Sequence, residues 1–383
     1  MAINLITTSS SVAGTNVTAN GGTLTYIAAG VIRSSTVGTA LANLAASDNC
    51  DVRVDGTLIG NGTGVSLTTD GTSDNHSLLV GATGIVQGYG GYGATVNGTN
   101  ASIYNLGEIA SFSGTAVVMT GSSAELTNFG TISSISGSAV LMSGFYLLVQ
   151  NHGAISAGGT IGLNVTGALG SAVRNFGTIS GSTTSILGSA NFDLVQNSGT
   201  LIGLVSLDAG NDIFNGTAGG AVTVAGGSGN DTLRGSAFED DLRGDDGNDR
   251  LVGGAGEDSL QGGIGLDRLQ GGADDDRLIG GAEADTMSGG SGDDVFLFSS
   301  LLDLGNALTA DRITDFASGD DLINLDPFGL TFISNAAFGA VAGQVRYAKG
   351  IGQLQVDQNG DGVLDFFLQF DKGTVLVATD LIL

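Results

Sequence analysis

An uninterrupted run of nine-residue units constrains this chain more than any other feature of its sequence. Eight units follow one another from Gly226 to Leu297, and each places Asp at its sixth position and Leu, Met or Phe at its eighth. The first unit reads GGSGNDTLR and the last GGSGDDVFL. Glycine lets the backbone turn through conformations that other residues avoid, and the lone large apolar residue indicates a short strand with one buried side chain. A fixed period of this kind predicts a stacked, repetitive architecture.

The chemistry of each unit predicts a bound cation. Asp adds a carboxylate to the carbonyl oxygens that the turning backbone exposes, and hard oxygen ligands suit Ca²⁺ rather than Zn²⁺. Without an ion the stacked carboxylates would repel one another, so we expect the energy of cation binding to become folding energy. The sixth-position residues are Asp231, Asp240, Asp249, Asp258, Asp267, Asp276, Asp285 and Asp294, and an earlier copy, LDAGNDIFN, supplies Asp212.

The repeat resembles the RTX nonapeptide family, whose units G-G-x-G-x-D-x-U-x bind Ca²⁺ in a parallel β-roll. The resemblance implies that two units form one coil and that units 18 residues apart stack, so that Asp231 pairs with Asp249 and, at the far end, Asp276 with Asp294. Asp212 would pair with Asp231 across a one-residue insertion. Each ion would take both sixth-position carboxylates, the second- and fourth-position carbonyls of the earlier unit, and the first- and third-position carbonyls of the later one. Those carbonyls belong to Gly227, Gly229, Gly244, Asp246, Gly247, Gly253, Gly254, Ala255, Gly256, Gly262, Gly263, Ile264, Gly265, Gly271, Ala273, Gly280, Ala282, Gly289 and Ser291.

Three units depart from the pattern at their fourth position, where Phe238, Asp274 and Glu283 replace glycine. The carbonyl oxygen remains, but a residue with a Cβ atom strains a turn that glycine would adopt freely. These three units are therefore the ones in which an ion site is in question.

A second repeat with a longer period occupies residues 1–206. Its motif, such as NFGTI, recurs at spacings of 23, 23, 24 and 22 residues. Three short apolar segments per period, separated by Gly and Ser, predict the three-faced coils of a parallel β-solenoid. We expect the last residues of the motif to stack as one internal row: Ile109, Ile132, Ile155, Ile179 and Leu201. The first residues of the motif would form a ladder in which the side-chain amides hydrogen-bond to one another. The alternative is that these amides contact an ordered external surface. The residues are Asn105, Asn128, Asn151, Asn175 and Asn197.

Charge and composition exclude several classes of partner. The net charge is -26, with only 12 Lys and Arg against 38 Asp and Glu, which argues against nucleic acid and anionic membranes. Cys50 is the single cysteine, so no intramolecular disulfide is expected. No 18-residue apolar run occurs, so we expect no transmembrane helix, and the start MAINLITTSS lacks the basic region of a signal peptide. Residues 1–206 hold eight acids, residues 207–297 hold 19 and residues 298–383 hold 11, which divides the chain into three regions.

The last region, residues 298–383, resembles the C-terminal region of type I secreted RTX proteins in the stretches DRITDFASGDDLINL and TDLIL. The resemblance implies a β-rich cap with an uncleaved export signal, and secretion to the cell exterior or surface by a Gram-negative bacterium. Within it, DQNGDGVLD spaces four oxygen-bearing side chains as an EF-hand loop does, although the twelfth position is Leu368 rather than Glu. A further Ca²⁺ site and a polar turn are equal alternatives for these residues: Asp357, Asn359, Asp361 and Asp365.

The predicted fold is all-β, a right-handed parallel β-solenoid that continues into a calcium-binding β-roll and ends in the cap. We expect a secreted, Ca²⁺-dependent structural protein that self-assembles or attaches at the cell surface. Two alternatives are an adhesin and a polysaccharide-acting enzyme or glycan-binding protein, because a β-helix followed by an RTX roll also resembles alginate epimerases. Catalysis is not expected, since the ionisable residues of the first region are scattered. Its one grouping, Asp70, Asp74 and His76, is more typical of a polar loop.

Overall fold

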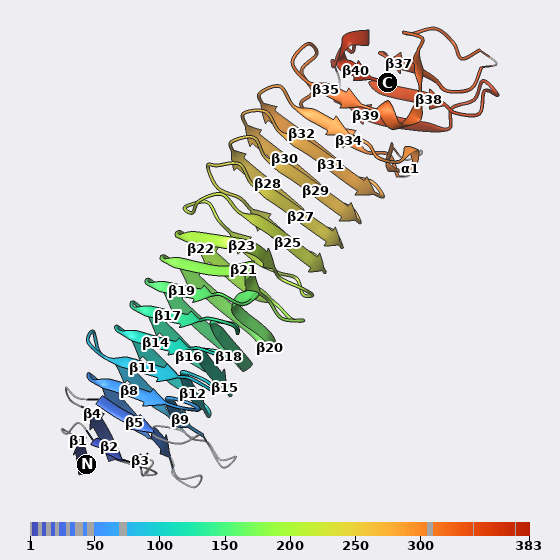
Figure 1. Ribbon diagram of the computed structural model, residues 1–383. Helices are drawn as coiled ribbons and strands as arrows, with labels where there is room; N and C mark the ends of the chain where they lie inside the picture. The colour runs from blue at the N-terminus through green and yellow to red at the C-terminus, as the bar shows by residue number, and fades with distance from the viewer. Residues whose placement is uncertain are drawn as a thin grey trace. The chain divides into compact units, whose positions relative to one another are not determined.

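A computed structural model describes residues 50–68, 75–304, 309–339, 341–371 and 373–383, together with the backbone of strands within residues 2–43. The chain forms two compact units, Met1–Ala209 and Gly210–Leu383. Both contain a parallel β-solenoid, in which strands pair with their equivalents one coil away (Figure 1), and the second unit ends in antiparallel strands.

The first unit has three strands per coil, arranged in three columns. The first column holds β1 (Ala2–Ile6), β4 (Thr23–Ile27), β7 (Asp51–Val54), β10 (Ser77–Val80), β13 (Ser102–Asn105), β16 (Glu125–Asn128) and β22 (Asp193–Asn197). The second holds β2 (Ser10–Val12), β5 (Val31–Ser34), β8 (Thr57–Gly60), β11 (Ile85–Gly88), β14 (Glu108–Ser111), β17 (Thr131–Ser134) and β19 (Ala154–Ala157). The third holds β3 (Val17–Ala19), β6 (Leu41–Asn43), β9 (Val65–Leu67), β12 (Ala94–Asn97) and β15 (Val117–Thr120).

Longer strands bend round the corners of the later coils. β18 (Val140–Asn151) pairs with both β15 and β16, so it runs from the third column into the first. β20 (Ile161–Asn175) follows the same path one coil later, beside β18. β21 (Thr178–Leu187) pairs with β19, β20 and β23 (Thr200–Ser206), so the last coils join the second and third columns.

Stacked apolar rows fill the interior of the first unit. The register pairs Ile109 with Ile132, Ile132 with Ile155, and Ile155 with Ile179. Leu201 ends this row opposite Ile179. All five side chains are buried, because strand alternation turns one side chain in two towards the axis.

The five motif asparagines form a buried hydrogen-bonded ladder beside this row. The Nδ2 of each of the first four donates to the Oδ1 of the asparagine one coil further, at 2.7 Å from Asn105 to Asn128 and 2.8 Å in the three later steps. A buried amide is costly unless its polar atoms are paired, and here each step of the ladder pairs them. The ladder therefore contributes to coil stacking rather than to an external surface.

The second unit begins as a narrower roll with two columns and an 18-residue coil, since Leu242 lies opposite Leu260 and Leu251 opposite Leu269. One column holds β24 (Ile213–Asn215), β26 (Thr232–Arg234), β28 (Arg250–Ala255), β30 (Arg268–Ala273), β32 (Thr286–Ser291) and β34 (Arg312–Ile313). The other holds β25 (Thr223–Ser228), β27 (Asp241–Asp246), β29 (Ser259–Ile264), β31 (Arg277–Ala282), β33 (Val295–Leu297) and β35 (Leu322–Asn324). The eighth-position side chain of each unit is buried between the columns.

The last part of the second unit covers the end of this roll. It contains α1 (Leu301–Leu304), η1 (Asp326–Phe328), β36 (Thr331–Phe332), β37 (Gln344–Ala348), β38 (Gln353–Asp357), β39 (Phe366–Phe370), η2 (Ala378–Asp380) and β40 (Leu381–Ile382). β39 pairs with β34 and β40 with β35, so both terminal strands of the roll gain a partner and present no open edge there. None of the helices in the described part of the chain has the length and hydropathy needed to cross a membrane.

Candidate metal centre

The repeated aspartates of the second unit lie one above another inside the turns of the roll. Each side chain is at most 3% exposed, because the carboxylate points into the turn rather than into solvent. From Asp231 to Asp276, the backbone N–H of each sixth-position Asp donates to Oδ1 of the Asp 18 residues later, at 2.7 Å from Asp231 to Asp249 and 2.9 Å from Asp276 to Asp294. Asp212 donates in the same way to Asp231, at 2.7 Å. The turns thus place the carboxylates in two rows, one on each side of the roll.

The second carboxylate oxygen of most of these residues is buried without a hydrogen-bond donor. This holds among the described residues for Oδ2 of Asp231, Asp249, Asp258, Asp267, Asp276, Asp285 and Asp294. An ionised oxygen removed from water without a partner is strongly unfavourable, and a cation is the partner that would satisfy it.

Glycine at the first position keeps a small space open in front of each Oδ2 atom. A Cβ atom on Gly262 would lie 2.3 Å from Oδ2 of Asp267 and 2.5 Å from the carbonyl oxygen of Gly280, one coil later. A Cβ atom on Gly271 would likewise lie 2.2 Å from Oδ2 of Asp276 and 2.6 Å from the carbonyl oxygen of Gly289. A carboxylate and a first-position carbonyl therefore border the same space, which is the hard-oxygen environment that Ca²⁺ prefers.

The backbone at the second and fourth positions turns through the left-handed region. Gly227 has φ 105° and Gly229 φ 133°, a conformation that glycine adopts without strain. Asp274, at φ 76°, and Glu283, at φ 87°, take the same conformation despite their Cβ atoms. The turn is therefore retained in two of the three units that depart from the pattern. At the third position, the carbonyl oxygen of Asp246 already accepts a backbone hydrogen bond from Gly229, at 2.7 Å.

The third unit that departs from the pattern, residues 235–243, has a different turn. Phe238 does not adopt a positive φ, and Oδ2 of Asp240 accepts a hydrogen bond from the backbone N–H of Ser236 at 2.5 Å. A bulky residue is disfavoured in the left-handed region, so the turn closes on its own carboxylate instead. The Asp240 carboxylate has both oxygens engaged, since Val222 N–H donates to Oδ1 at 2.7 Å.

This difference leads to a paired mutational prediction. We expect Asp258→Asn to reduce the number of Ca²⁺ ions bound by at least one, because it removes an oxygen with no donor of its own. Asp240→Asn is the matched control and should leave that number unchanged, because its Oδ2 already has a donor. Isothermal titration calorimetry together with metal analysis after dialysis would measure both. Equal losses in the two variants would contradict this account of the Phe238 turn.

Two aspartates outside the repeats extend the rows. Asp285 N–H donates to Oδ1 of Asp311 at 2.8 Å, and Asp294 N–H donates to Oδ1 of Asp321 at 3.1 Å. Asp311 is fully buried, and its Oδ2 also lacks a donor. The nine-residue period does not reveal either residue, because spacings of 26 and 27 replace 18. Their signal is the core of the repeat, Asp followed two residues later by an apolar residue, in DRI and DLI.

A further repeat-like turn lies in the first unit, at residues 188–196, GSANFDLVQ. Its sixth residue, Asp193, is buried, and a Cβ atom on Gly188 would lie 2.9 Å from Oδ2 of Asp193 and 2.5 Å from the carbonyl oxygen of Leu207. Both carboxylate oxygens are engaged: Ser171 Oγ donates to Oδ1 and Ser189 N–H to Oδ2, each at 2.6 Å. This turn therefore resembles that of Asp240, because in both turns protein hydrogen-bond donors engage the two carboxylate oxygens.

Burial raises the pKa of the stacked carboxyl groups. Loss of solvation is the largest cause, and neighbouring carboxylates add to it. The pKa rises to about 7 for Asp249, Asp258, Asp276 and Asp285, to about 6 for Asp267 and Asp294, and to about 9 for Asp311. The roll thus opposes the ionised form of its own side chains, an opposition that a bound cation would reverse.

The EF-hand-like stretch forms the turn between β38 and β39. Asp357 accepts hydrogen bonds from the N–H groups of Gly360, at 2.7 Å, and Gly362, at 3.0 Å. Asp365 accepts one from Gln358 N–H at 2.8 Å and one from Asn359 Nδ2 at 3.2 Å, and Asp361 accepts one from Val363 N–H at 2.8 Å. These contacts close a hairpin.

Ionisable groups are not concentrated elsewhere in the described chain. In the portion that the structure describes, His, Cys, Asp and Glu side chains nowhere gather in threes as a metal-binding group, so a cation in the roll would depend on carbonyl oxygens as well. Asp70 and Asp74 lie outside the described residues. His76 is buried, and its Nδ1 accepts a hydrogen bond from Cys50 N–H at 3.1 Å. In the first unit Arg53 pairs with Asp55, and Gln150 donates to Glu125.

Comparison with known proteins places the similarity in the second unit. Residues 220–383 match the family described as Peptidase M10 serralysin C terminal. Together with the nine-residue period, this match identifies the second unit as a carrier of RTX-type repeats. A solved structure, the AlgE6R3 subunit from the Azotobacter vinelandii mannuronan C5-epimerase, is 26% identical over 40% of this chain and 77% of that chain, with a TM-score of 0.27. No curated protein matches the chain.

Proposed function

We propose that this is a secreted, Ca²⁺-dependent structural protein whose second unit folds around several Ca²⁺ ions and whose first unit supports self-assembly or attachment at the cell surface. The observation that carries the calcium dependence is the row of buried Oδ2 atoms, four of which face a space bordered by a carbonyl oxygen of the next coil: those of Asp231, Asp249, Asp267 and Asp276. Ions there would be held by the sixth-position carboxylates and by backbone carbonyls, and would neutralise charge that the apo roll must otherwise bury.

A requirement for Ca²⁺ in the folding of the second unit is compatible with export. A type I secretion system of a Gram-negative bacterium would carry the chain outwards unfolded, because low cytosolic Ca²⁺ leaves the carboxylates mutually repulsive. Higher extracellular Ca²⁺ would then fold the second unit outside the cell, with the cap protecting the end of the roll.

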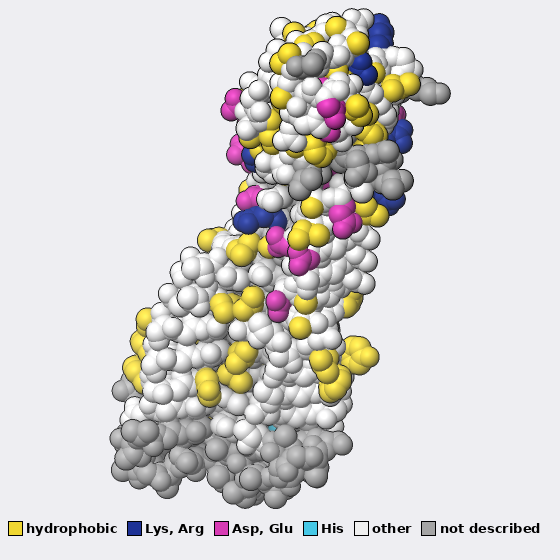
Figure 2. All heavy atoms as spheres, turned by 90° about the vertical axis from the view of Figure 1, so that its right-hand side faces the viewer, with side chains coloured by type: hydrophobic (Ala, Val, Ile, Leu, Met, Phe, Trp, Pro, Cys, Tyr) yellow, Lys and Arg dark blue, Asp and Glu magenta, His cyan; other side chains and the backbone are white. Residues whose placement is uncertain are grey.

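The first unit supports assembly through its regular and nearly uncharged surface. Residues 1–206 hold eight acids and three Arg. On the face shown in Figure 2, hydrophobic and uncharged side chains cover most of the described part of this unit, and charged side chains lie chiefly on the second unit. A surface with few charges allows copies of an otherwise acidic protein to approach one another.

Electron microscopy of the purified full chain, with Ca²⁺ and with EGTA, tests the proposal. We expect ordered sheets, fibres or clusters with Ca²⁺ that disappear on chelation. A protein that stays monomeric in Ca²⁺ at all accessible concentrations, or that degrades or binds a glycan as a monomer, would contradict it.

A further inference from the structure

Four half-exposed apolar side chains gather at one corner of the first unit, where the chain passes from the third column to the first. Phe145 is 51% exposed, Tyr146 77%, Leu169 48% and Phe192 48%. Phe145 and Leu169 lie side by side on β18 and β20. These four residues are called the corner patch below. Large apolar side chains grouped in this way mark an interaction site more often than isolated ones do.

The backbone at Tyr146 is strained in a way that packing within one copy does not explain. Its φ is 54°, and the same corner position holds Ser123, at 56°, and Asn100, at 55°, in the two preceding coils. Asn and Ser fit a left-handed corner, whereas a bulky aromatic residue is disfavoured there. An aromatic side chain held in a strained conformation and exposed to water is unfavourable for the isolated molecule, so the outlier points to a function.

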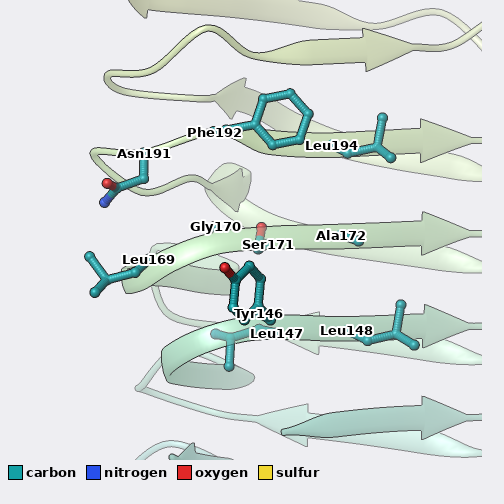
Figure 3. A pocket seen from close by; sticks show the side chains of 10 residues that line it. All are labelled: Tyr146, Leu147, Leu148, Leu169, Gly170, Ser171, Ala172, Asn191, Phe192 and Leu194. Atoms are coloured by element: carbon teal, nitrogen blue, oxygen red, sulfur yellow. The ribbon is translucent and has the colours of Figure 1, made fainter. Parts of the chain in front are cut away.

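A pocket of about 580 Å³ opens beside Tyr146. Figure 3 shows Leu148, Ala172 and Leu194 one above another on three adjacent strands, with the small Ala172 between the two leucines. Gly170 lies opposite Tyr146 and has φ 101°, and a Cβ atom there would meet only the carbonyl oxygen of Phe192, at 3.4 Å. The coil of Gly170 and Ala172 is therefore recessed between two coils that carry large side chains.

The charge of the chain indicates what covers the patch. No Asp, Glu, Lys, Arg or His lines the pocket, although the whole chain has a net charge of -26. Two copies can therefore meet at this corner without placing like charges against each other, whereas the repeats of the second unit carry 19 acids within residues 207–297.

The other exposed aromatic rows of the first unit cover their own ring faces. His152 lies between Phe129 and Phe176, with ring centroids 4.4 and 4.6 Å apart, and Tyr89 stacks on Phe112 at 4.4 Å. The rings of Tyr146 and Phe192 belong to neither of these stacks. The corner patch thus presents exposed aromatic rings that are not covered by either stack.

We propose that the corner patch is a contact between two copies of this chain, in which Tyr146 of each copy enters the pocket beside Ala172 of the other. A projecting side chain next to a recess is self-complementary, as a two-fold contact requires. Four residues support only a weak contact, which repetition within an assembly strengthens. The inference rests on the proposed self-assembly and assigns it a surface.

The test uses the full chain in Ca²⁺ and sedimentation velocity over a concentration series. The double variant Phe145→Ser, Tyr146→Ser reproduces the Ser122–Ser123 pair of the preceding coil, so the coil should fold. Phe176→Ser is the matched control, because Phe176 is also 51% exposed and Ser198 occupies the equivalent position one coil later. We expect the double variant to raise the dissociation constant of self-association about tenfold or more, and the control to change it less than about twofold.

A second measurement locates the contact directly. A photocrosslinking residue at Leu169, in a mixture of ¹⁴N- and ¹⁵N-labelled copies, should yield crosslinks between the corner patches of different copies. If the wild type assembles but the double variant assembles equally well, or if the crosslinks fall elsewhere, the inference is wrong and the proposed function stands. If the wild type does not self-associate at all, both fail. Loss of neutral-glycan binding in the double variant, with self-association unchanged, would overturn the inference in favour of a glycan.

Discussion

Chelation of Ca²⁺ with EGTA at pH 8 is expected to unfold residues 226–297 and to leave residues 75–209 folded. The core of the roll is thin, with one buried apolar side chain per nine residues, and it shares the interior with carboxylates whose Oδ2 atoms lack donors. Each site contributes about 2.7 kcal/mol when the free ion is at 100 times its dissociation constant, so several sites together exceed the stability of an ordinary domain.

The first unit should resist the same treatment because its contacts need no ion. Its apolar rows and its asparagine ladder are complete within the protein. Even its one repeat-like carboxylate, Asp193, is held by Ser171 and Ser189. The unit therefore keeps its hydrogen bonds and its core when Ca²⁺ is removed.

Hydrogen exchange measured by mass spectrometry would resolve the two units in one experiment. Peptides from the repeats should lose protection in EGTA and regain it with Ca²⁺. Mg²⁺ should restore much less protection than Ca²⁺, because Mg²⁺ requires a tighter octahedral geometry and loses its bound waters less readily. Unchanged protection of the repeats in EGTA, or loss of protection in both units together, would show that the carboxylate rows do not control folding.

Strict periodicity made much of this fold predictable. The nine-residue period predicted stacking at a multiple of nine, the resemblance to RTX repeats implied 18, and the structure pairs Leu242 with Leu260 accordingly. The longer period in the first region likewise predicted the row from Ile109 to Leu201 and the asparagine ladder, because equivalent residues of a solenoid must lie above one another.

The deviations from periodicity were harder to predict, because they depend on backbone conformation. Phe238, Asp274 and Glu283 all replace glycine, yet only Phe238 is absent from the left-handed region and coincides with a self-closed carboxylate. Asp311 and Asp321 were missed because insertions separate them from the repeats, although the strands they precede continue the columns. The pocket at Ala172 arises between coils 22 to 24 residues apart, and no local pattern reveals such a recess.

Acidification is expected to replace Ca²⁺ in part. In EGTA, we expect the roll to be unfolded at pH 8 and to regain β-structure as the pH falls to 5. The carboxyl groups of Asp249, Asp258, Asp276 and Asp285 have a pKa of about 7 in the folded roll, against an ordinary value of 3.8. The folded state therefore binds more protons than the unfolded chain between these values, and its stability rises as pH falls through 7. Ionising one such group costs the folded roll about 4 kcal/mol.

Ca²⁺ binding should show the opposite dependence on pH, since the ion requires the ionised carboxylates. The Ca²⁺ concentration at the midpoint of ion binding should rise steadily from pH 8 to pH 5, when followed by isothermal titration calorimetry. A midpoint that does not move, or an apo roll as unfolded at pH 5 as at pH 8, would refute the argument.

Two variants test this linkage between proton uptake and folding at single carboxyl groups. Asp285→Asn should stabilise the apo roll at pH 8 and do so less at pH 5, because asparagine resembles the protonated acid, needs no proton uptake on folding, and still offers Oδ1 to the N–H of Asp267. Asp311→Asn should stabilise the apo roll at pH 8 at least as much, because the pKa of Asp311 is about 9 in the folded roll, so folding of the wild type there requires the uptake of a proton that asparagine does not need. In Ca²⁺ the folded roll of both variants should be less stable than that of the wild type, since each variant lacks one carboxylate charge that would attract the ions.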